Sequence, residues 1–174
     1  MNEHLIVPWL NNHDSLPPDA VIHSVLSDDS PLIFSIKDFI DKDTCDTIIE
    51  LATPLFKKAV YKTHDESTPS EYSKGRKCDI SWLHWSSSAL LEAIANELAY
   101  IVGVKKCRFE HFQILRYEEG GLFNRHNDAY QFTKIDDSNF VKDGQRVATA
   151  IIYLNDGFTG GETCFYEDLI KPEP

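Results

Sequence analysis

The change of hydrophobic spacing near residue 107 is the feature that most limits how this chain of 174 residues can fold. Before it, two stretches carry apolar residues at helical spacing, one over residues 42–53 and one ending near Gly103. After it, apolar residues alternate along residues 107–116, which is typical of a strand. Helices followed by short strands predict an α+β protein whose second half is a strand sandwich or barrel.

The two predicted helices have recognisable ends. Asp41 is expected to cap the first helix at its N-terminus, and Pro54 is expected to end it. The second helix is expected to begin after Ser86 or Ser87 and to stop at Gly103. Both helices carry an apolar stripe, so each should pack one face against the rest of the domain.

Further strands are expected on both sides of the two helices. Alternating apolar residues predict one over residues 31–39, ahead of the first helix. Three more are expected after the second helix, at residues 122–126, 147–154 and 162–166. The run 147–154 is so rich in β-branched side chains that we expect it to be buried.

The start of the chain differs from the rest in composition. Residues 1–30 carry turn and breaker signals and are predicted to form an irregular N-terminal arm, which leaves residues 31–174 as the folded domain. No apolar run reaches the length of a membrane span, and no Lys or Arg occurs before Lys37 to provide the positive start of a signal peptide. We therefore expect a cytoplasmic protein with no membrane partner.

The charge balance limits the classes of partner. The chain has 28 acidic and 17 basic side chains, a formal net charge of -11. This balance argues against a nucleic-acid binder, because phosphate binding needs clustered Lys and Arg. It permits a neutral or basic partner such as a peptide, and it leaves the oligomeric state open.

His126 and Asp128 form the sharpest chemical feature of the sequence. On an extended chain, residues two apart point to the same side, so the imidazole and the carboxylate can converge on one metal ion. Nitrogen with a hard oxygen is the ligand mixture of non-haem Fe(II) sites with two histidines and one carboxylate. A second pair of this kind, His64 and Glu66, lies in a polar stretch that we interpret as a solvated loop.

Two ordered blocks around this pair resemble the prolyl 4-hydroxylase family. Residues 113–128 are similar to the family's strand that ends in Arg-Tyr and runs through a glycine turn into His-x-Asp. Residues 146–156 and 160–165 are similar to a later block of the same family. The resemblance covers roughly residues 31–170. It implies a double-stranded β-helix, or jelly roll, with the N-terminal helices packed on it.

The resemblance also implies an activity and roles for four residues. The activity is that of an Fe(II)/2-oxoglutarate-dependent dioxygenase that hydroxylates a prolyl or other residue in a peptide or protein. Its cofactors would be Fe(2+), 2-oxoglutarate and L-ascorbate, with dioxygen as co-substrate and succinate as product. His126 and Asp128 would bind the iron, Tyr117 would contact 2-oxoglutarate, and Thr163 would lie near its carboxylate. Packing at a strand end for Tyr117, and simple strand formation for Thr163, stay open as alternatives.

The sequence departs from the family pattern after these blocks. The family has a distal histidine as third iron ligand, followed by a Lys or Arg for 2-oxoglutarate, whereas no histidine follows His126 before Pro174. Four or five strands can be counted where a jelly roll has about eight. We therefore expect a domain truncated at its C-terminus, with little activity of its own. One alternative is a jelly-roll module that has lost catalysis and only binds. Another is that a second chain supplies the missing strands.

Overall fold

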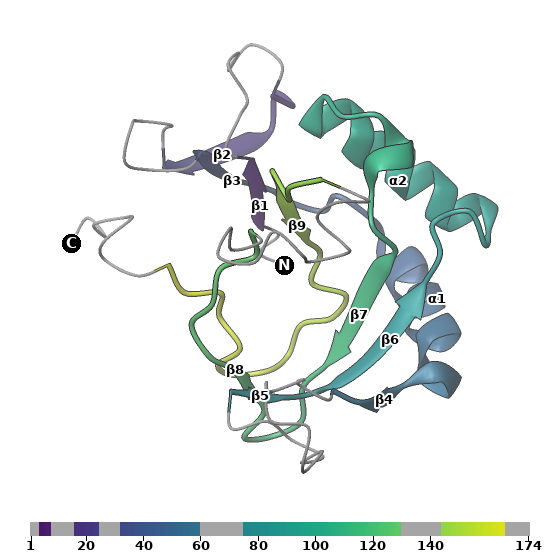
Figure 1. Cartoon of the computed structure of the whole chain (residues 1–174), viewed down its shortest axis with the longest axis vertical. Helices are drawn as coiled ribbons and strands as arrows, with labels where there is room; N and C mark the ends of the chain where they lie inside the picture. Colours follow the sequence, from purple (N-terminus) through teal and green to yellow (C-terminus); the bar gives the residue numbers. More distant parts are fainter. Residues whose placement is uncertain (1–3, 8–15, 25–31, 60–74, 130–143, 166–174) are drawn as a thin grey trace.

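The computed structural model describes residues 4–7, 16–24, 32–59, 75–129 and 144–165. Two helices and antiparallel strands make up these ranges, and Figure 1 shows both helices on the same outer side of the molecule. The described strands form two larger sheets and one two-stranded ribbon rather than a closed barrel. An α+β arrangement is therefore present.

Both helices begin and end where local sequence signals predict. Helix α1 (Lys42–Ala52) starts with the Asp41 carboxylate accepting a hydrogen bond from the backbone N–H of Thr44 at 2.7 Å. A single 3-10 turn, η2 (Thr53–Leu55), contains Pro54 and closes the segment. Helix α2 (Ala89–Val102) begins at Ser88, whose hydroxyl accepts from the N–H of Leu91, and ends at Gly103 with φ 70°. The two predicted helices are confirmed.

The first sheet has the strand order β2-β3-β1-β9. Its strands are β1 (His4–Val7), β2 (Ala20–Ser24), β3 (Leu32–Ile36) and β9 (Thr149–Ile151). Strand β1 is central and pairs antiparallel with both β3 and β9. The structure thus differs from the expected irregular arm, because two segments of residues 1–30 gain backbone partners from distant parts of the chain. The division into an arm and a domain stays a prediction.

The second sheet has the order β4-β6-β7, and a separate ribbon pairs β5 with β8. The sheet strands are β4 (Lys57–Lys58), β6 (Asp79–Leu83) and β7 (Phe112–Arg116). The ribbon strands are β5 (Arg76–Lys77) and β8 (Leu122–Phe123). Figure 1 shows β6 and β7 running beside α1, with the ribbon at their lower end. The ribbon leads directly into the segment that carries His126.

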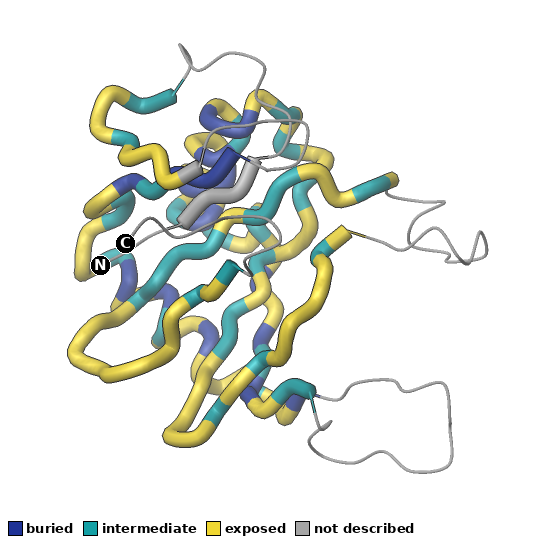
Figure 2. The backbone as a smooth tube through the Cα atoms, turned by 90° about the vertical axis from the view of Figure 1, so that its left-hand side faces the viewer, coloured by how far each residue is buried: buried dark blue, intermediate teal, exposed yellow. Residues whose placement is uncertain are grey.

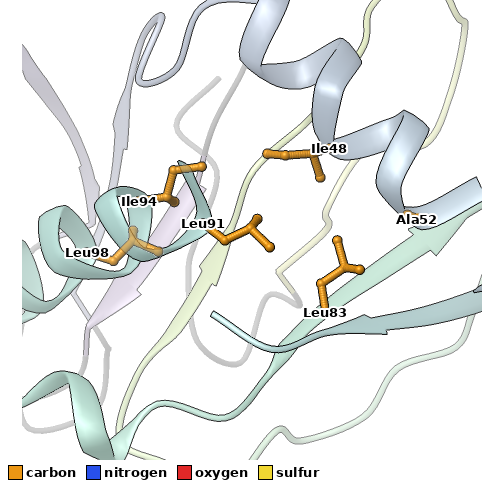
Figure 3. Close-up of a cluster of buried hydrophobic side chains, with 6 residues drawn as sticks. All are labelled: Ile48, Ala52, Leu83, Leu91, Ile94 and Leu98. Atoms are coloured by element: carbon orange, nitrogen blue, oxygen red, sulfur yellow. The ribbon is translucent and has the colours of Figure 1, made fainter. Parts of the chain in front are cut away.

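The hydrophobic core lies between the helices and the sheets. One cluster joins α1, α2 and β6, and Figure 3 shows its side chains facing one another. It consists of Ile48, Ala52, Leu83, Leu91, Ile94 and Leu98. A second cluster packs β3 against the end of α2. In Figure 2, the ribbon end of the molecule is mostly intermediate or exposed. Burial is therefore concentrated on the helical side.

Three predicted strands of the second half are corrected. The strand expected over 122–126 ends at Phe123. The strand expected over 147–154 is limited to Thr149–Ile151 and is partly exposed, because β9 is the outermost strand of its sheet among the described residues. Residues 161–165 have no regular secondary structure. His64 and Glu66 lie outside the described residues.

Candidate metal and cosubstrate site

The β5–β8 ribbon places His126 through a tight glycine turn. Arg76 lies opposite Phe123 in the ribbon, and the N–H of Asn124 donates to the carbonyl of Gly75 at 2.7 Å. The turn before β8 is closed by the N–H of Gly121 donating to the carbonyl of Glu118. Three residues after the ribbon ends at Phe123, the chain reaches the imidazole.

The imidazole of His126 is held on one edge and on one face. Its Nδ1 lies 2.7 Å from the carbonyl oxygen of Asn124. A carbonyl oxygen can only accept, so Nδ1 must carry the hydrogen, and the lone pair of the neutral ring is on Nε2. The ring of Phe123 stacks on the imidazole with 3.6 Å between centroids. Nε2 is thus the atom that is available as a metal ligand.

The carboxylate of Asp128 faces that nitrogen. Oδ1 lies 3.2 Å from His126 Nε2, and each of the two side chains is about two-fifths exposed, at 41% and 42%. The other oxygen, Oδ2, accepts a hydrogen bond from the hydroxyl of Thr149 at 2.6 Å. The convergence predicted from their spacing is present, although it does not come from strand geometry, because neither residue lies in a strand.

The backbone of Asp128 has a separate support. Arg146 Nη1 donates to the carbonyl oxygen of Asp128 at 3.2 Å. The same guanidinium makes two hydrogen bonds to Glu110, from Nε at 2.6 Å and from Nη2 at 2.8 Å. A guanidinium bound at two points keeps its plane fixed. The main chain at Asp128 is therefore tied to two other segments of the protein.

Tyr117 and Thr163 are connected through a third residue, Tyr153. Tyr117 follows β7 and is 45% exposed. Partial burial raises the pKa of its phenol to about 12, and Cys78 makes a smaller contribution in the same direction. Tyr153 also contributes to this rise in the pKa of Tyr117. The hydroxyl of Tyr153 lies 2.8 Å from that of Thr163 and donates weakly to the carbonyl of Gly161 at 3.3 Å. At neutral pH, Tyr117 is a hydrogen-bond donor.

Arg76 lies between these two groups of residues. Its guanidinium carbon is 4.4 Å from the centroid of the Phe123 ring, which stacks on His126. Its Nε donates to the Cys78 sulfur at 3.3 Å, and its charge lowers the pKa of Tyr117 against the larger effect of burial. The ribbon thus brings a cation close to both candidate sites.

Comparison with known proteins finds a family profile and curated relatives that match the chain. Residues 112–173 match the profile of the 2OG-Fe(II) oxygenase superfamily. The chain is 32% identical over 143 residues to prolyl 4-hydroxylase 1 of Arabidopsis thaliana, which covers 78% of this chain and 47% of that protein. These matches support a prolyl 4-hydroxylase-like 2OG-Fe(II) oxygenase family for the chain. The family resemblance drawn from the two blocks is confirmed.

Other relatives of this chain carry the same kind of name. It is 31% identical over 136 residues to probable prolyl 4-hydroxylase 8 of Arabidopsis thaliana, with 78% of this chain and 45% of the relative covered. The chain therefore spans about half the length of the curated relatives it matches. No solved structure gave a significant match. Within the described ranges, neither helix has the length and apolar character needed to cross a bilayer.

The donor set at His126 and Asp128 fits the iron of this superfamily. With its hydrogen on Nδ1, the imidazole turns Nε2 toward a carboxylate oxygen 3.2 Å away. A metal ion or a proton between these two atoms would be attracted by both. One nitrogen and one hard oxygen suit Fe(II). In the described part of the chain, no group of three or more His, Cys, Asp and Glu side chains is arranged to hold a metal ion.

Sequence reasoning missed several residues that support the candidate site. They are Arg76, Glu110, Phe123, Arg146, Thr149 and Tyr153. Arg146, Thr149 and Tyr153 lie in the block 146–156 that resembles the family, which was the available signal for them. Phe123 lies in the other such block, residues 113–128, three residues before His126. Arg76 and Glu110 could not be found from sequence, because their contacts join segments far apart in the chain.

Proposed function

We propose that this chain forms part of an Fe(II)/2-oxoglutarate-dependent dioxygenase that hydroxylates a prolyl or other residue in a peptide or protein. The observation that carries the proposal is the facing pair of His126 Nε2 and Asp128 Oδ1, 3.2 Å apart, with the imidazole hydrogen held on the opposite nitrogen. The relatives, named as prolyl 4-hydroxylases, support the choice of reaction. The scaffold that we propose for it is the jelly roll of this superfamily.

Two side chains of the chain would hold the metal ion. His126 would bind through Nε2 and Asp128 through Oδ1, which is the oxygen that Thr149 leaves available. Fe(2+), when bound with 2-oxoglutarate and dioxygen, supplies the oxidising chemistry that hydroxylates a C–H bond while 2-oxoglutarate is decarboxylated to succinate and carbon dioxide. L-ascorbate is proposed as an accessory cofactor. The protein residues fix the donor atoms in place, and second contacts such as those of Asn124 and Thr149 orient them.

Tyr117 and Thr163 are proposed to bind 2-oxoglutarate. Both would donate from a hydroxyl group, and an oxygen of an ionised carboxylate accepts such bonds strongly. The pKa of about 12 keeps Tyr117 protonated at neutral pH, as a donor must be. Tyr153 bonds to Thr163 at 2.8 Å and lies close enough to Tyr117 to influence its pKa. The shared neighbour supports a common binding region for the two.

The substrate class follows from charge and from the names of the relatives. A chain with a formal net charge of -11 suits a neutral or basic peptide and repels phosphate. The relatives are named as prolyl 4-hydroxylases, which supports a peptidyl proline as the reacting residue. The cytoplasmic location stays a prediction from sequence.

Metal titration tests the site without requiring activity. Mn(II) would be titrated calorimetrically into the wild-type chain and into His126→Ala, Asp128→Ala and His111→Ala. We expect the first two substitutions to weaken binding by about 10-fold or more, since each removes a direct ligand. His111 is exposed and contacts His84, so His111→Ala should bind as the wild type does. Unchanged affinity in both ligand variants would refute the site.

Succinate release separates the two candidate functions. The chain would be incubated with Fe(II), 2-oxoglutarate, ascorbate and a proline-containing basic peptide. Release that depends on His126 supports the hydroxylase and argues against the alternative, a jelly-roll module that binds a peptide and does not oxidise it. Metal and peptide binding without release is the result expected of that module and also of a chain with the little activity expected from its sequence.

A further inference from the structure

We infer that Thr149 is a positioning residue that holds the Asp128 carboxylate with Oδ1 turned toward His126. The inference rests on the proposed function, in which Asp128 binds the metal ion. Thr149 lies 21 residues after Asp128, so the contact is formed by the fold and not by local chain geometry. The new claim is that this contact between Thr149 and Asp128 strengthens metal binding.

The two oxygens of the Asp128 carboxylate have different partners. Oδ2 accepts the hydroxyl of Thr149 at 2.6 Å, whereas Oδ1 lies 3.2 Å from His126 Nε2. A hydrogen bond from a hydroxyl to an ionised carboxylate at this distance is short and charge-assisted. It fixes the rotation of the carboxylate about its last bond. Without it, either oxygen could turn toward the imidazole.

Thr149 is well placed for this task because it is the first residue of β9. Its register partner across the sheet is Ile6 of β1. A β-branched side chain on a paired strand has few rotamers, so the hydroxyl is presented to Asp128 at little entropic cost. The donor is therefore fixed before any metal ion arrives.

The backbone of Asp128 is held independently of Thr149. Arg146 donates to the Asp128 carbonyl at 3.2 Å and is itself bound by Glu110 through two hydrogen bonds. Removing the hydroxyl of Thr149 should therefore leave the main chain in place and free only the carboxylate. This separation makes a local effect on the ligand distinguishable from a general loosening of the site.

The experiment measures Mn(II) affinity by calorimetry in the wild-type chain, Thr149→Val and Thr149→Ser. Loss of a group that orients a metal ligand commonly costs 10–100-fold in affinity, so we expect Thr149→Val to weaken Mn(II) binding by about 10-fold or more. Thr149→Ser keeps the hydroxyl and should stay within about 3-fold of the wild type. If Thr149→Val does not fold, Thr149→Ala takes its place with the same expected loss.

A matched control uses a threonine whose hydroxyl also makes a hydrogen bond. Thr47 on α1 donates to the carbonyl of Asp43 at 2.8 Å, and Thr47→Val should leave Mn(II) affinity unchanged. Thermal unfolding of the metal-free variants provides a second readout. A positioning role predicts that Thr149→Val binds Mn(II) much more weakly and that Thr149→Ser binds nearly as the wild type does. A role in packing alone would not produce this difference between the two variants.

The outcomes separate this inference from the function on which it rests. If Asp128→Ala abolishes Mn(II) binding while Thr149→Val binds as the wild type does, the site stands and the role of Thr149 is refuted. If Thr149→Ser is as weak as Thr149→Val, the hydroxyl is not responsible and the inference is also refuted. If Asp128→Ala does not change Mn(II) binding, the proposed site fails, and the positioning role of Thr149 fails with it.

Discussion

The ring of Phe123 lies almost parallel to the imidazole of His126, with 3.6 Å between centroids and 18° between planes. The guanidinium of Arg76 lies over the same phenyl ring at 4.4 Å. The Arg76 guanidinium, the Phe123 ring and the His126 imidazole therefore lie against one another in that order. Because Nδ1 is also bound to Asn124, the imidazole has little freedom to rotate. A ligand held in this way loses less entropy when it binds a metal ion.

Shortening Phe123 should weaken the metal site. Aromatic stacking contributes about 0.5–1.5 kcal/mol beyond simple burial, so Phe123→Leu should raise the dissociation constant for Mn(II) by about 3- to 10-fold. Phe123→Tyr keeps the ring and serves as the matched control, with affinity near that of the wild type. Equal affinity in Phe123→Leu and the wild type would show that the stacking does not support His126.

The phenol of Tyr117 should lose its proton at unusually high pH. Its pKa rises from 10.0 to about 12 on folding, mainly through burial. The phenol of the unfolded chain therefore ionises first as the pH rises. The contribution of protonated Tyr117 to the stability of the fold is complete below pH 10.0 and is lost as the pH rises through about 12. Ultraviolet titration should detect an ionisation near pH 12 that disappears in Tyr117→Phe. Tyr100→Phe is the control and should retain it; a titration unchanged by Tyr117→Phe would contradict the assignment.

A methyl group at Gly121 should disrupt the turn that leads to His126. An added Cβ would lie 2.8 Å from the carbonyl of Glu118 and 3.1 Å from that of Lys77, both backbone atoms that cannot easily move. We expect Gly121→Ala to lower the free energy of unfolding by about 2 kcal/mol, as overpacking does. Gly75→Ala is the control, since its nearest neighbour is 3.8 Å away in the Asn124 side chain. Chemical denaturation measures both, and equal stability of the two variants would be inconsistent with this steric account.

The buried carboxylate of Asp79 should make the fold sensitive to acid. Asp79 is 6% exposed and pairs with Arg116 at 2.5 Å and Lys58 at 3.2 Å. Hydrogen bonding to Arg116, opposed by burial and assisted by Lys58, holds the pKa of this carboxyl below its ordinary value of 3.8. Its contribution to stability is therefore present above that ordinary value and is lost as the pH falls through the lower folded value.

Asp79→Asn tests this contribution directly. We expect a loss of about 2 kcal/mol in the free energy of unfolding at neutral pH, since a buried charged partner is removed. The difference from the wild type should shrink in acid. Asp46→Asn, which removes an exposed partner of Lys42, should change stability by less than about 0.5 kcal/mol. Equal effects of the two substitutions would argue against the buried pair.

The helices could be predicted from sequence because their signals are local. Asp41 caps α1 through Thr44, three residues away, and Gly103 ends α2 by its own backbone conformation. Strand β6 was missed for the opposite reason. Its partner β7 lies about thirty residues later, with Leu83 opposite Phe112, so the pairing that makes residues 79–83 a strand is not visible in that segment.

The approach of His126 and Asp128 was predicted, but its cause was not. We expected an extended strand to aim both side chains at one point, whereas β8 ends at Phe123. The two side chains instead converge because Asn124 orients the imidazole and Thr149 orients the carboxylate. The contact between Thr149 and Asp128 joins segments 21 residues apart. The spacing of residues along one sequence carries no information about such a contact.

Strand β1 links the very beginning of the chain to the candidate iron ligand. It occupies the position between β3 and β9, and it is the described backbone partner of the strand that presents Thr149. Residues 4–7 are therefore not a neutral place for a deletion. Removing them should leave β9 without its described neighbour and should weaken metal binding through the strand that presents Thr149.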